Sequence, residues 1–498
     1  MSESAKSNKV TLVHSGEKGG YVHFPLSILY LAASLQKNGF EPRLVDLRVQ
    51  DFTPDDIDGS LYLGVSTMTG SMQIPPALAC AAIAESRSVP VVFGGAHPSM
   101  LLEQTCAHPL VDIAVKGEGE EVAVEIAEHF QGKRDLSSIK GIAYKDESGK
   151  VLLTADRKPP PFDEVTHLPY HLLPMEEYLA SKSDFGFQSS RGCPHRCAFC
   201  AEVALYARTW RPKPARIVVE EIEEIIRQFN PERIFFYDSN FFCSKKRVEE
   251  FCSLIIERGI KTKFYGECRF DYFSKYHPEF LDLIKRAGFN ENLFGGESGS
   301  DATLAFIKKD INTEQIIKSI EMCKEAGLKS FTSFMIGFPG ESDREMRKTL
   351  EMYDRILTID PEGAKINGMF VYSPFPGTEL FNTAVEKYEY VPPQSLDGWA
   401  KFELYDSSNI TWLDEKKKRK VQTISTLVRY FFVHKTLKDW AFSEKVKRHG
   451  GFLKAILSTL FDSVLYPIAR LRWRMRFFDL GYEFKFWQKV FHAYMGRK

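Results

Sequence analysis

Two runs of alternating strand and helix patterns, separated by a proline-rich break, constrain the fold of this 498-residue chain more than any other feature. The first run spans residues 10–130, and the second spans residues 187–385. In both runs, short apolar segments typical of buried strands alternate with longer segments of helical periodicity. Neighbouring parallel strands need a crossover connection, which such a helix supplies. The chain is therefore predicted to be an α/β protein with two successive parallel sheets.

The first run predicts a Rossmann-like, doubly wound sheet. Its expected strands lie near residues 10–14, 43–46, 62–65, 90–93 and 111–115, and its expected helices span residues 26–37, 73–86 and 118–130. Ligands of such sheets bind beyond the carboxyl ends of the strands. The segments expected at that edge are residues 66–70, 94–98 and 116–119.

The second run contains about six βα units, the first of which starts near Phe187. Further strand patterns lie at residues 233–237, 263–267, 291–295, 330–336 and 368–372, and helix patterns at residues 215–229, 245–258, 278–287, 313–326 and 342–357. Six units are fewer than the eight that close a (β/α)8 barrel. We therefore expect a partial (β/α)6 barrel.

The domain boundaries follow from where the two runs stop. Residues 1–135 are assigned to the Rossmann-like domain, and residues 186–400 to the partial barrel. The stretch between them, residues 136–185, contains a small hairpin pattern and three consecutive prolines, and we interpret it as a linker. Residues 401–498 are predicted to form a helical C-terminal domain.

The C-terminal region is basic and aromatic. Residues 441–498 hold 12 Lys and Arg against 4 Asp and Glu, and residues 471–498 are dense in Phe, Trp and Tyr. Two interpretations stay open. The region is either a helical cap whose aromatic side chains pack on the barrel, or a surface that contacts an anionic membrane, with residues 452–469 as a helix in the membrane plane.

Charge and hydropathy exclude other classes. The whole chain balances 66 Lys and Arg against 66 Asp and Glu, so nucleic acid is not an expected partner. No uninterrupted apolar run of about 20 residues occurs, and the first nine residues are polar. We therefore expect a cytoplasmic protein, with the C-terminal region as the candidate for peripheral membrane contact.

Three of the nine cysteines are clustered, at Cys193, Cys197 and Cys200. The other six are scattered, so a disulfide scaffold is not expected. Thiolates spaced C-x3-C-x2-C in one loop can bind three irons of a cubane cluster and leave the fourth iron open. Zinc is the alternative, but it wants a fourth ligand, and His195 lies awkwardly between two of the cysteines. The spacing therefore favours a [4Fe–4S] cluster.

This spacing, after the first strand of a partial barrel, resembles the radical S-adenosylmethionine (SAM) superfamily. Residues 236–241, 266–271, 295–300, 337–341 and 372–378 resemble motifs that follow the later strands in that superfamily. The resemblance implies that the open iron chelates SAM and that reductive cleavage of SAM yields a 5′-deoxyadenosyl radical. It places Phe199 near the adenine and Glu297 near the ribose. The cofactor-binding residues that it implies are Phe199, Asp238, Arg269, Glu297, Ser298, Gly337 and Tyr372.

A Rossmann-like domain before such a barrel resembles the cobalamin (B12)-binding subgroup, which includes methyltransferases and the anaerobic Mg-protoporphyrin monomethyl ester oxidative cyclase. The resemblance covers residues 9–385. It implies a cobalamin site at the carboxyl end of the first sheet. The residues implied there are Ser66, Thr67, Thr69, Gly94, Gly95, His97, Gly117 and Glu118. The Asp-x-His-x-x-Gly motif that supplies a lower cobalt ligand in many such domains is missing around His14, His23 and His97. No histidine is therefore expected to ligate cobalt.

Tyr237, Tyr265 and Arg269 lie at predicted ends of barrel strands. Each tyrosine either lines the substrate site, as a candidate for a catalytic role, or is plain packing. Arg269 either pairs with a carboxylate of SAM or substrate, or forms a structural pair with Asp271 or Glu267.

The cysteines outside the cluster have a separate set of interpretations. Cys268, like Cys243, follows a barrel strand, and its thiol either gives a hydrogen atom to a product radical or fills the core as a small apolar group. The cysteines on helix patterns are expected in the core: Cys80, Cys106, Cys252 and Cys323.

Together these patterns predict a cobalamin-dependent radical SAM enzyme that methylates an unactivated carbon of a small molecule. Methylcobalamin would deliver the methyl group, and a second SAM would regenerate it. A hydrophobic substrate such as a lipid, isoprenoid or porphyrin suits the membrane interpretation, and the resemblance implies a flavodoxin or ferredoxin as electron donor. One alternative is oxidative cyclisation or rearrangement with the same cofactors. The other is a non-catalytic module that binds cobalamin or an iron–sulfur cluster.

Overall fold

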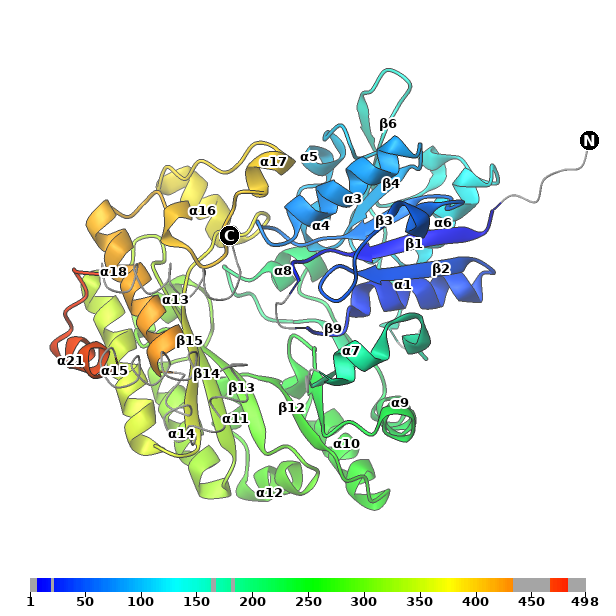
Figure 1. The fold of residues 1–498 in the computed structure, drawn as a ribbon. Coiled ribbons are helices and arrows are strands. Elements are labelled where there is room, and N and C mark those ends of the chain that lie inside the picture. The colour runs from blue at the N-terminus through cyan, green and yellow to red at the C-terminus, as the bar shows by residue number, and fades with distance from the viewer. Residues whose placement is uncertain (1–6, 19–21, 163–166, 181–183, 433–465, 482–498) are drawn as a thin grey trace, which may run out of the picture.

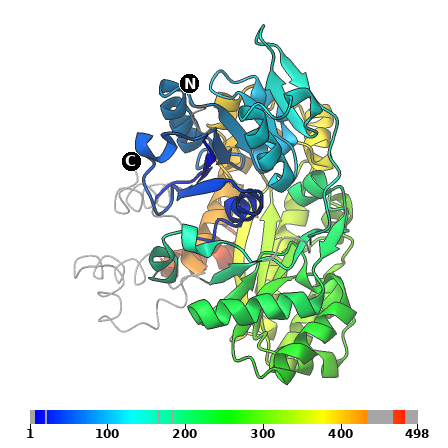
Figure 2. The same ribbon diagram turned by 90° about the vertical axis from the view of Figure 1, so that its right-hand side faces the viewer.

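The computed structural model describes residues 7–18, 22–162, 167–180, 184–432 and 466–481. Two α/β domains stack on each other, with the first, blue-to-cyan domain above the green-to-yellow barrel in both views (Figures 1 and 2). The yellow and orange segments that follow the barrel lie beside both domains. The predicted α/β fold with two successive domains is confirmed.

The first sheet has seven strands in the order β2-β1-β3-β4-β5-β6-β7. Its five parallel strands are β1 (Lys9–His14), β2 (Glu41–Asp46), β3 (Leu63–Ser66), β4 (Val91–Gly94) and β5 (Ile113–Val115). Helices α1 (Leu26–Lys37) and α6 (Glu120–Phe130) share one core, whereas α3 (Ile74–Ser86) buries its small side chains in another. Three short helices complete the domain: α2 (Pro54–Ile57), α4 (Ala96–Met100) and α5 (Leu102–Cys106).

The predicted hairpin extends this sheet and is not part of a linker. β6 (Ile142–Lys145) pairs antiparallel with β5, and β7 (Val151–Leu153) pairs antiparallel with β6. Ile142 and Ala143 are fully buried, because the hairpin covers the edge that β5 would otherwise expose. This corrects the interpretation of residues 136–185 in their first part, and it makes the first sheet mixed.

The second sheet has six strands that are all parallel and adjacent in chain order. They are β8 (Phe185–Phe187), β11 (Arg233–Phe236), β12 (Lys263–Cys268), β13 (Glu291–Glu297), β14 (Lys329–Ile336) and β15 (Ala364–Val371). The crossover helices are α9 (Ala215–Phe229), α10 (Lys245–Glu257), α12 (Pro278–Arg286), α14 (Thr313–Ala326) and α15 (Asp343–Ile359), and α16 (Glu379–Lys387) follows the last strand. Because β8 and β15 do not pair, the sheet is the expected partial barrel.

The two faces of the barrel strands differ in burial. Phe264, Gly266 and Cys268 of β12 face the helices and are buried, whereas Tyr265 and Glu267 lie on the opposite, inner face and are more exposed. This follows from the period of two along a strand. The inner face continues across the sheet, since Glu267 pairs in register with Leu293, and Leu293 with Phe331.

A segment after the barrel returns to the first domain, and we call residues 393–404 the strap. It contains α17 (Leu396–Trp399), and Leu396, Trp399 and Phe402 are buried in the same core as α3. The Ser71 N–H donates a hydrogen bond to the Phe402 carbonyl at 2.9 Å. The strap therefore fastens the C-terminal half of the chain to the first domain, which the sequence patterns did not predict.

The described part of the C-terminal region contains the expected helices, whereas most of residues 401–414 and residues 476–481 are not helical. The helices include α18 (Glu415–Thr426), the π-helix η6 (Leu427–Phe432) and α21 (Tyr466–Met475). Trp473 and Phe478 are buried, and the Trp473 indole N–H donates to Asp354 of α15 at 2.8 Å. These two aromatic residues thus pack as the cap interpretation predicts. Most of the predicted helix at residues 452–469 lies outside the described residues. None of the described helices is long and apolar enough to cross a membrane.

Candidate active site

The three clustered cysteines lie in the loop of residues 193–200, which we call the cysteine loop. It joins β9 (Ser190–Gly192) to α8 (Ala201–Tyr206), and β9 is held by antiparallel pairing with β10 (Trp210–Pro212). Cys197 is buried, whereas Cys193 and Cys200 are partly exposed. Burial raises the pKa of the Cys200 thiol to about 12, so a thiolate there needs positive charge beside it.

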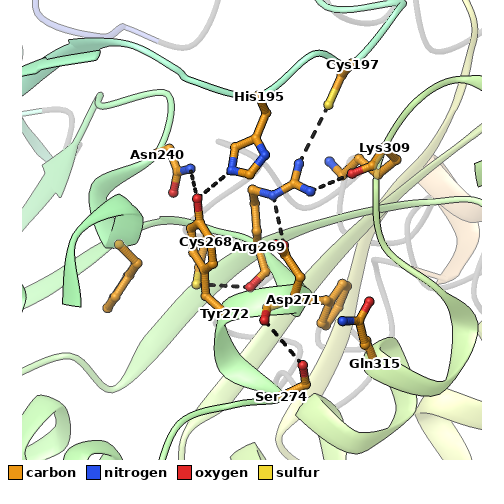
Figure 3. Close-up of polar contacts among 12 residues, drawn as sticks. His195, Cys197, Asn240, Cys268, Arg269, Asp271, Tyr272, Ser274, Lys309 and Gln315 are labelled. Carbon is orange, nitrogen blue, oxygen red and sulfur yellow. Dashed lines mark hydrogen bonds and ion pairs between the residues drawn. The ribbon is translucent and has the colours of Figure 1, made fainter. Parts of the chain in front are cut away.

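Two donors approach the thiols from neighbouring strand ends, and Figure 3 shows the one that reaches Cys197. The Arg269 guanidinium donates to the Cys197 sulfur at 3.6 Å, and the Asn240 amide lies 3.9 Å from the Cys193 sulfur. Arg269 is fixed by Asp271 at 2.9 Å and by the Lys309 carbonyl. The structural pair with Asp271 is therefore confirmed, and the same guanidinium also reaches the cysteine loop.

This donor set fits a [4Fe–4S] cluster. Three thiols come from one loop, and a fixed cation stands beside the buried one. In the part of the chain that the structure describes, no three His, Cys, Asp or Glu side chains are grouped as ligands of a single metal ion. Thiolates of a cubane cluster bind separate irons, so they need not meet at one point. Cys193, Cys197 and Cys200 are the residues that would hold the cluster.

His195 is not placed to act as a fourth metal ligand, because its ring is hydrogen-bonded elsewhere. Its Nε2 atom forms a hydrogen bond with the Tyr272 hydroxyl, which also accepts from Asn240 at 3.3 Å (Figure 3). Burial, with help from Arg269, lowers the pKa of His195 to about 4, so the ring is neutral. His195 therefore positions the loop through Tyr272.

Glu297 and Lys309 form a buried ion pair of 2.7 Å beside the cysteine loop. Burial opposes the charge of Lys309, but the Glu297 carboxylate raises the pKa of the lysine above its usual value. A Cβ at position 295 would lie 2.3 Å from the Glu297 carboxylate and 2.5 Å from the Lys309 ammonium, so a larger residue there would displace the ends of this pair. The Lys309 ammonium also lies 5.9 Å from the centre of the Phe199 ring. The predicted roles of Glu297 and Phe199 in SAM binding stay predictions, and the sequence offered no signal for Lys309.

Other predicted SAM residues occupy structural positions. Asp238 is buried and accepts hydrogen bonds of 2.6 Å from the Ser189 N–H and from the Ser189 and Ser190 hydroxyls. Ser298 is buried beside Thr349, with 3.1 Å between their hydroxyl oxygens. Asp238 and Ser298 therefore brace strand ends, and their contact with SAM stays a prediction.

An aromatic group lines the barrel end next to Phe199. The rings of Phe338 and Tyr372 are 5.2 Å apart, and Phe338 lies 6.2 Å from Phe199. The Trp412 indole N–H donates to the Gly337 carbonyl at 3.1 Å. Gly337 and Tyr372 thus come together with Phe199, but Phe338 and Tyr372 are buried in the core, and the contact of Gly337 and Tyr372 with SAM stays a prediction.

The candidate catalytic residues Cys268 and Tyr265 lie in different parts of the barrel. Cys268 is 4% exposed and lies on the helix-facing side of β12. The interpretation of Cys268 as a core residue is therefore confirmed. The alternative, that its thiol gives a hydrogen atom to a radical in the barrel interior, is wrong. The Tyr265 hydroxyl is bonded to Asp184, which immediately precedes β8, and its ring stacks on Phe235 at 4.5 Å. Tyr265 therefore lies at the amino-terminal end of the barrel. The predicted core cysteines on helices are all buried: Cys80, Cys106, Cys252 and Cys323.

Tyr237 joins the two domains. Its hydroxyl and the Nδ1 atom of His23 are 2.6 Å apart. Burial, and then the positive charge of Arg48, lower the pKa of His23 to about 4. The ring that forms the hydrogen bond with Tyr237 is therefore neutral. Tyr237 thereby lies where the carboxyl end of β11 meets the first domain.

Glu267 is an inner-face residue that the patterns did not select as a site residue. It stands one residue before Cys268, on the opposite face of β12. The alternation along β12 could have selected it, since only one of two adjacent residues can face the interior.

In the first domain, the predicted cobalamin residues form two turns, residues 66–69 and 94–97, which we call the twin turns. The Thr69 hydroxyl and His97 Nδ1 are 2.9 Å apart. Gly95 has a φ of +100°, and a Cβ on it would lie 2.6 Å from the Thr67 carbonyl oxygen. The Ser66 hydroxyl donates to Ser27 at 3.0 Å. The backbones of the two turns thus pack closely, and their side chains are uncharged.

His97 carries a buried polar atom that fits a bound group. The residue is fully buried, and its Nε2 atom has no hydrogen-bond partner among the described residues. The Trp399 indole N–H of the strap is likewise unpaired within the described chain, and the two rings are 6.0 Å apart. Met68 and Met72 beside the turns are exposed. Unpaired buried nitrogen atoms, close backbone approach and exposed apolar side chains together suit a large ligand with polar and apolar parts, such as cobalamin.

Glu118 pairs with two arginines of the second domain, and its predicted contact with cobalamin stays a prediction. Its carboxylate pairs with Arg191 of β9 at 2.8 Å and with Arg211 of β10. Arg191 also pairs with Glu120 at 2.6 Å. Glu118 therefore clamps the first domain to the strand that leads into the cysteine loop. The neighbouring Gly117 N–H donates to Ser99 at 2.9 Å.

Comparisons with known proteins agree with both halves of this site. Residues 187–353 match the family described as the radical SAM superfamily, and residues 16–127 match the B12 binding domain. An uncharacterized methyltransferase of Pyrococcus horikoshii is 29% identical over 446 residues, which cover 86% of this chain and 91% of that protein. The anaerobic magnesium-protoporphyrin IX monomethyl ester cyclase of Rubrivivax gelatinosus is 25% identical, over 90% of this chain and 81% of its own. The fold is similar to that of the cobalamin-dependent SAM radical enzyme OxsB with aqua-cobalamin and SAM bound, with a TM-score of 0.71 and 20% identity, covering 89% of this chain and 68% of that one.

Proposed function

We propose that this chain, a B12-binding radical SAM enzyme related to the Mg-protoporphyrin cyclases and the B12-dependent radical SAM methyltransferases, methylates an unactivated carbon of a small molecule. The observation that carries the proposal is the clamp between the domains. Arg191 and Arg211 join Glu118 at one point, and Tyr237 joins His23 at another. A methyl donor on the twin turns and a radical source on the cysteine loop would therefore share one enclosed space.

When bound, the cluster, SAM and cobalamin supply the electron, the hydrogen-abstracting radical and the methyl group. The chain supplies position and charge. Arg269 neutralises thiolate charge at Cys197, and Lys309 holds Glu297 in a fixed, buried orientation. These groups are pre-oriented by hydrogen bonds from strand ends, so they need little rearrangement when ligands bind.

The inner face of the barrel would receive the substrate. Leu293 and Phe331 are register neighbours there, and Glu267 adds one carboxyl group beside them. An apolar wall excludes water and stray hydrogen donors, which would quench a carbon radical. We therefore propose a largely apolar small molecule as substrate, with an electron donor of the flavodoxin or ferredoxin type.

Oxidative cyclisation or rearrangement is the second candidate function, because a curated relative over most of the chain is a cyclase. Both functions need the same cofactor sites, so the residues do not separate them. The product does, because methylation adds one CH2 unit to the substrate and cyclisation does not.

The test uses anaerobically purified protein from cells supplied with iron and cobalamin. Its visible spectrum is recorded, and 5′-deoxyadenosine is assayed after addition of SAM and dithionite. Cobalamin bands together with 5′-deoxyadenosine support the proposal, and candidate substrates are then screened for the mass of a methyl group. Cleavage of SAM without bound cobalamin would contradict methyl transfer from cobalamin, and no cleavage at all would favour a non-catalytic module.

A further inference from the structure

An apolar stripe is exposed along α21 and the residues that follow it. Its members are 41–65% exposed: Ile468, Leu471 and Met475, whose spacing places them on one side of α21, and Phe477 and Leu480 after the helix. Such a run is unusual on a protein surface, because scattered single apolar residues are the norm. The stripe therefore needs an explanation beyond the packing of α21.

The opposite side of the same segment is fixed to the barrel. Trp473 and Phe478 are buried, and the Trp473 ring lies 4.8 Å from the ring of Tyr353. The Trp473 indole and the Arg476 guanidinium both bind the Asp354 carboxylate, at 2.8 and 2.5 Å. The stripe is therefore held facing outward, because the face that could pack inward is already occupied.

Cations border the stripe. A cleft of about 280 Å³ lies beside Arg476 and Phe478, which are chain neighbours of stripe residues, and its other charged lining residues are Asp343, Arg344, Arg347 and Lys420. Lys420 pairs with Asp343 at 3.1 Å, and Arg476 pairs with Asp354. No ion pair is found for Arg344 or Arg347 within the described part of the chain, and both are exposed. Arg474 of α21 is also exposed, directly before Met475.

We propose that this face, the apolar stripe with its bordering arginines, binds the surface of a membrane that contains anionic phospholipid. Apolar side chains projecting outward from a fixed helix, with arginines beside them, are the arrangement by which an interfacial helix inserts between headgroups and pairs with their phosphates. An uncharged apolar partner would leave Arg344, Arg347 and Arg474 without counter-charges. Neither the cofactor sites nor the proposed methyl transfer enter this inference.

The experiment is co-sedimentation of the full-length protein with vesicles at low salt. One set of vesicles contains equal parts of phosphatidylcholine and phosphatidylglycerol, and the other contains phosphatidylcholine alone. We expect the protein to sediment with the first set only, and to be released by added salt, because salt screens the arginine–phosphate attraction. Equal binding to both sets, or to neither, would overturn the proposal.

Two variants separate the apolar and the charged contributions. Leu471→Glu/Met475→Glu is expected to weaken binding at least about tenfold, and Arg344→Glu/Arg347→Glu by about as much. The control is Val391→Glu, since Val391 is an exposed apolar residue outside the stripe. The second pair lies on exposed positions of α15, so it tests the surface even if the first pair perturbs α21.

Gel filtration tests whether a second copy of the chain, rather than a membrane, covers the apolar stripe. If the wild-type protein is a dimer and Leu471→Glu/Met475→Glu is a monomer that still binds vesicles, the stripe is an interface between two copies. The membrane proposal is then wrong. A monomer in both cases, with loss of vesicle binding in the variant, supports it.

Discussion

The cysteine loop and the twin turns belong to the two domains that the Glu118–Arg191 pair joins, but they are built by opposite means. The cysteine loop is surrounded by charge: Arg269 beside Cys197, and the Glu297–Lys309 pair next to it. The twin turns contain small and neutral groups, with Gly95 against Thr67 and a His97 ring whose pKa burial lowers to about 4. The first region must stabilise thiolates and ionic ligands, whereas the second must accommodate a bulky group by its shape. We therefore expect the first to be sensitive to changes of charge and the second to changes of volume.

The largest effect is expected from removal of one loop thiol. Cys197→Ala should abolish bound iron and 5′-deoxyadenosine formation, a loss of at least about a hundredfold, because even residues behind a metal ligand contribute 10- to 100-fold. The control is Cys252→Ala, which removes an equally buried cysteine from α10. Iron content and 5′-deoxyadenosine are measured on both. If Cys252→Ala lost iron to the same extent, the cysteine loop would not be a specific cluster site.

The next effect concerns the clamp that aligns the two regions. Arg191→Ala leaves Glu120 without its buried partner and Glu118 with Arg211 alone, and it removes a guanidinium that lies 4.6 Å from the centre of the Tyr30 ring. Breaking a buried pair costs about 3–5 kcal/mol of unfolding free energy. Urea unfolding measures it.

The matched change for the clamp is Arg196→Ala, since the Arg196–Asp310 pair is exposed and should be worth less than about 1 kcal/mol. If the two regions act independently, a folded Arg191→Ala protein keeps its cluster and its cobalamin and loses only product formation. Equal stability of both variants would contradict the clamp.

The same contrast explains how much could be predicted from the sequence. The spacing of the cysteines is local, so the loop and the βα order around it were predicted with helix limits within two residues. Lys309 reaches the loop through the tertiary fold, and no local pattern marks it. Asn240 lies within the motif at residues 236–241, but the motif does not show that its amide points at a cysteine. The strap was missed for the same reason, since Trp399 packs against residues about 300 positions earlier.

One error was avoidable. Tyr265 and Cys268 were both considered candidates for the barrel interior, although residues three apart on a strand face opposite sides. The burial of Phe264 and Cys268 on one face and the exposure of Glu267 on the other follow from that parity. The roles of Glu118 and Asp238 were not accessible in this way, because a carboxylate at a strand end looks the same whether it binds a cofactor or an arginine.

A smaller effect tests the role of charge at the barrel end. Burial raises the pKa of Glu341 from 4.5 to about 8, while its carboxyl group accepts the Gly337 N–H at 2.7 Å. The protonated form is therefore favoured in the folded state. The stability that it confers is fully present below about pH 4.5 and is lost as the pH rises through 8.

The corresponding substitution is Glu341→Gln, which cannot ionise. Between pH 5 and pH 8 the unfolding free energy of the wild-type protein should fall relative to that of the variant by about 2 kcal/mol, since one pKa unit corresponds to about 1.4 kcal/mol and the side chain keeps some contact with water. Urea unfolding at several pH values measures the difference, with the exposed Glu351→Gln as control. A difference independent of pH would show that Glu341 is ionised throughout.

The smallest effect tests shape at the twin turns with two adjacent glycines. A Cβ on Gly95 would meet the Thr67 carbonyl oxygen at 2.6 Å in a backbone conformation with φ of +100°, whereas a Cβ on Gly94 would meet nothing within 4 Å. Gly95→Ala should therefore cost about 1–2 kcal/mol and reduce the cobalamin retained after gel filtration, while Gly94→Ala should leave the stability nearly unchanged. If Gly94→Ala alone reduced retention, the open side of Gly94 would be where the ligand approaches, and the tight contact at Gly95 would serve only to hold the turns together. Equal retention by both variants would show that cobalamin does not bind at the twin turns, and shape would then no longer distinguish them from the cysteine loop.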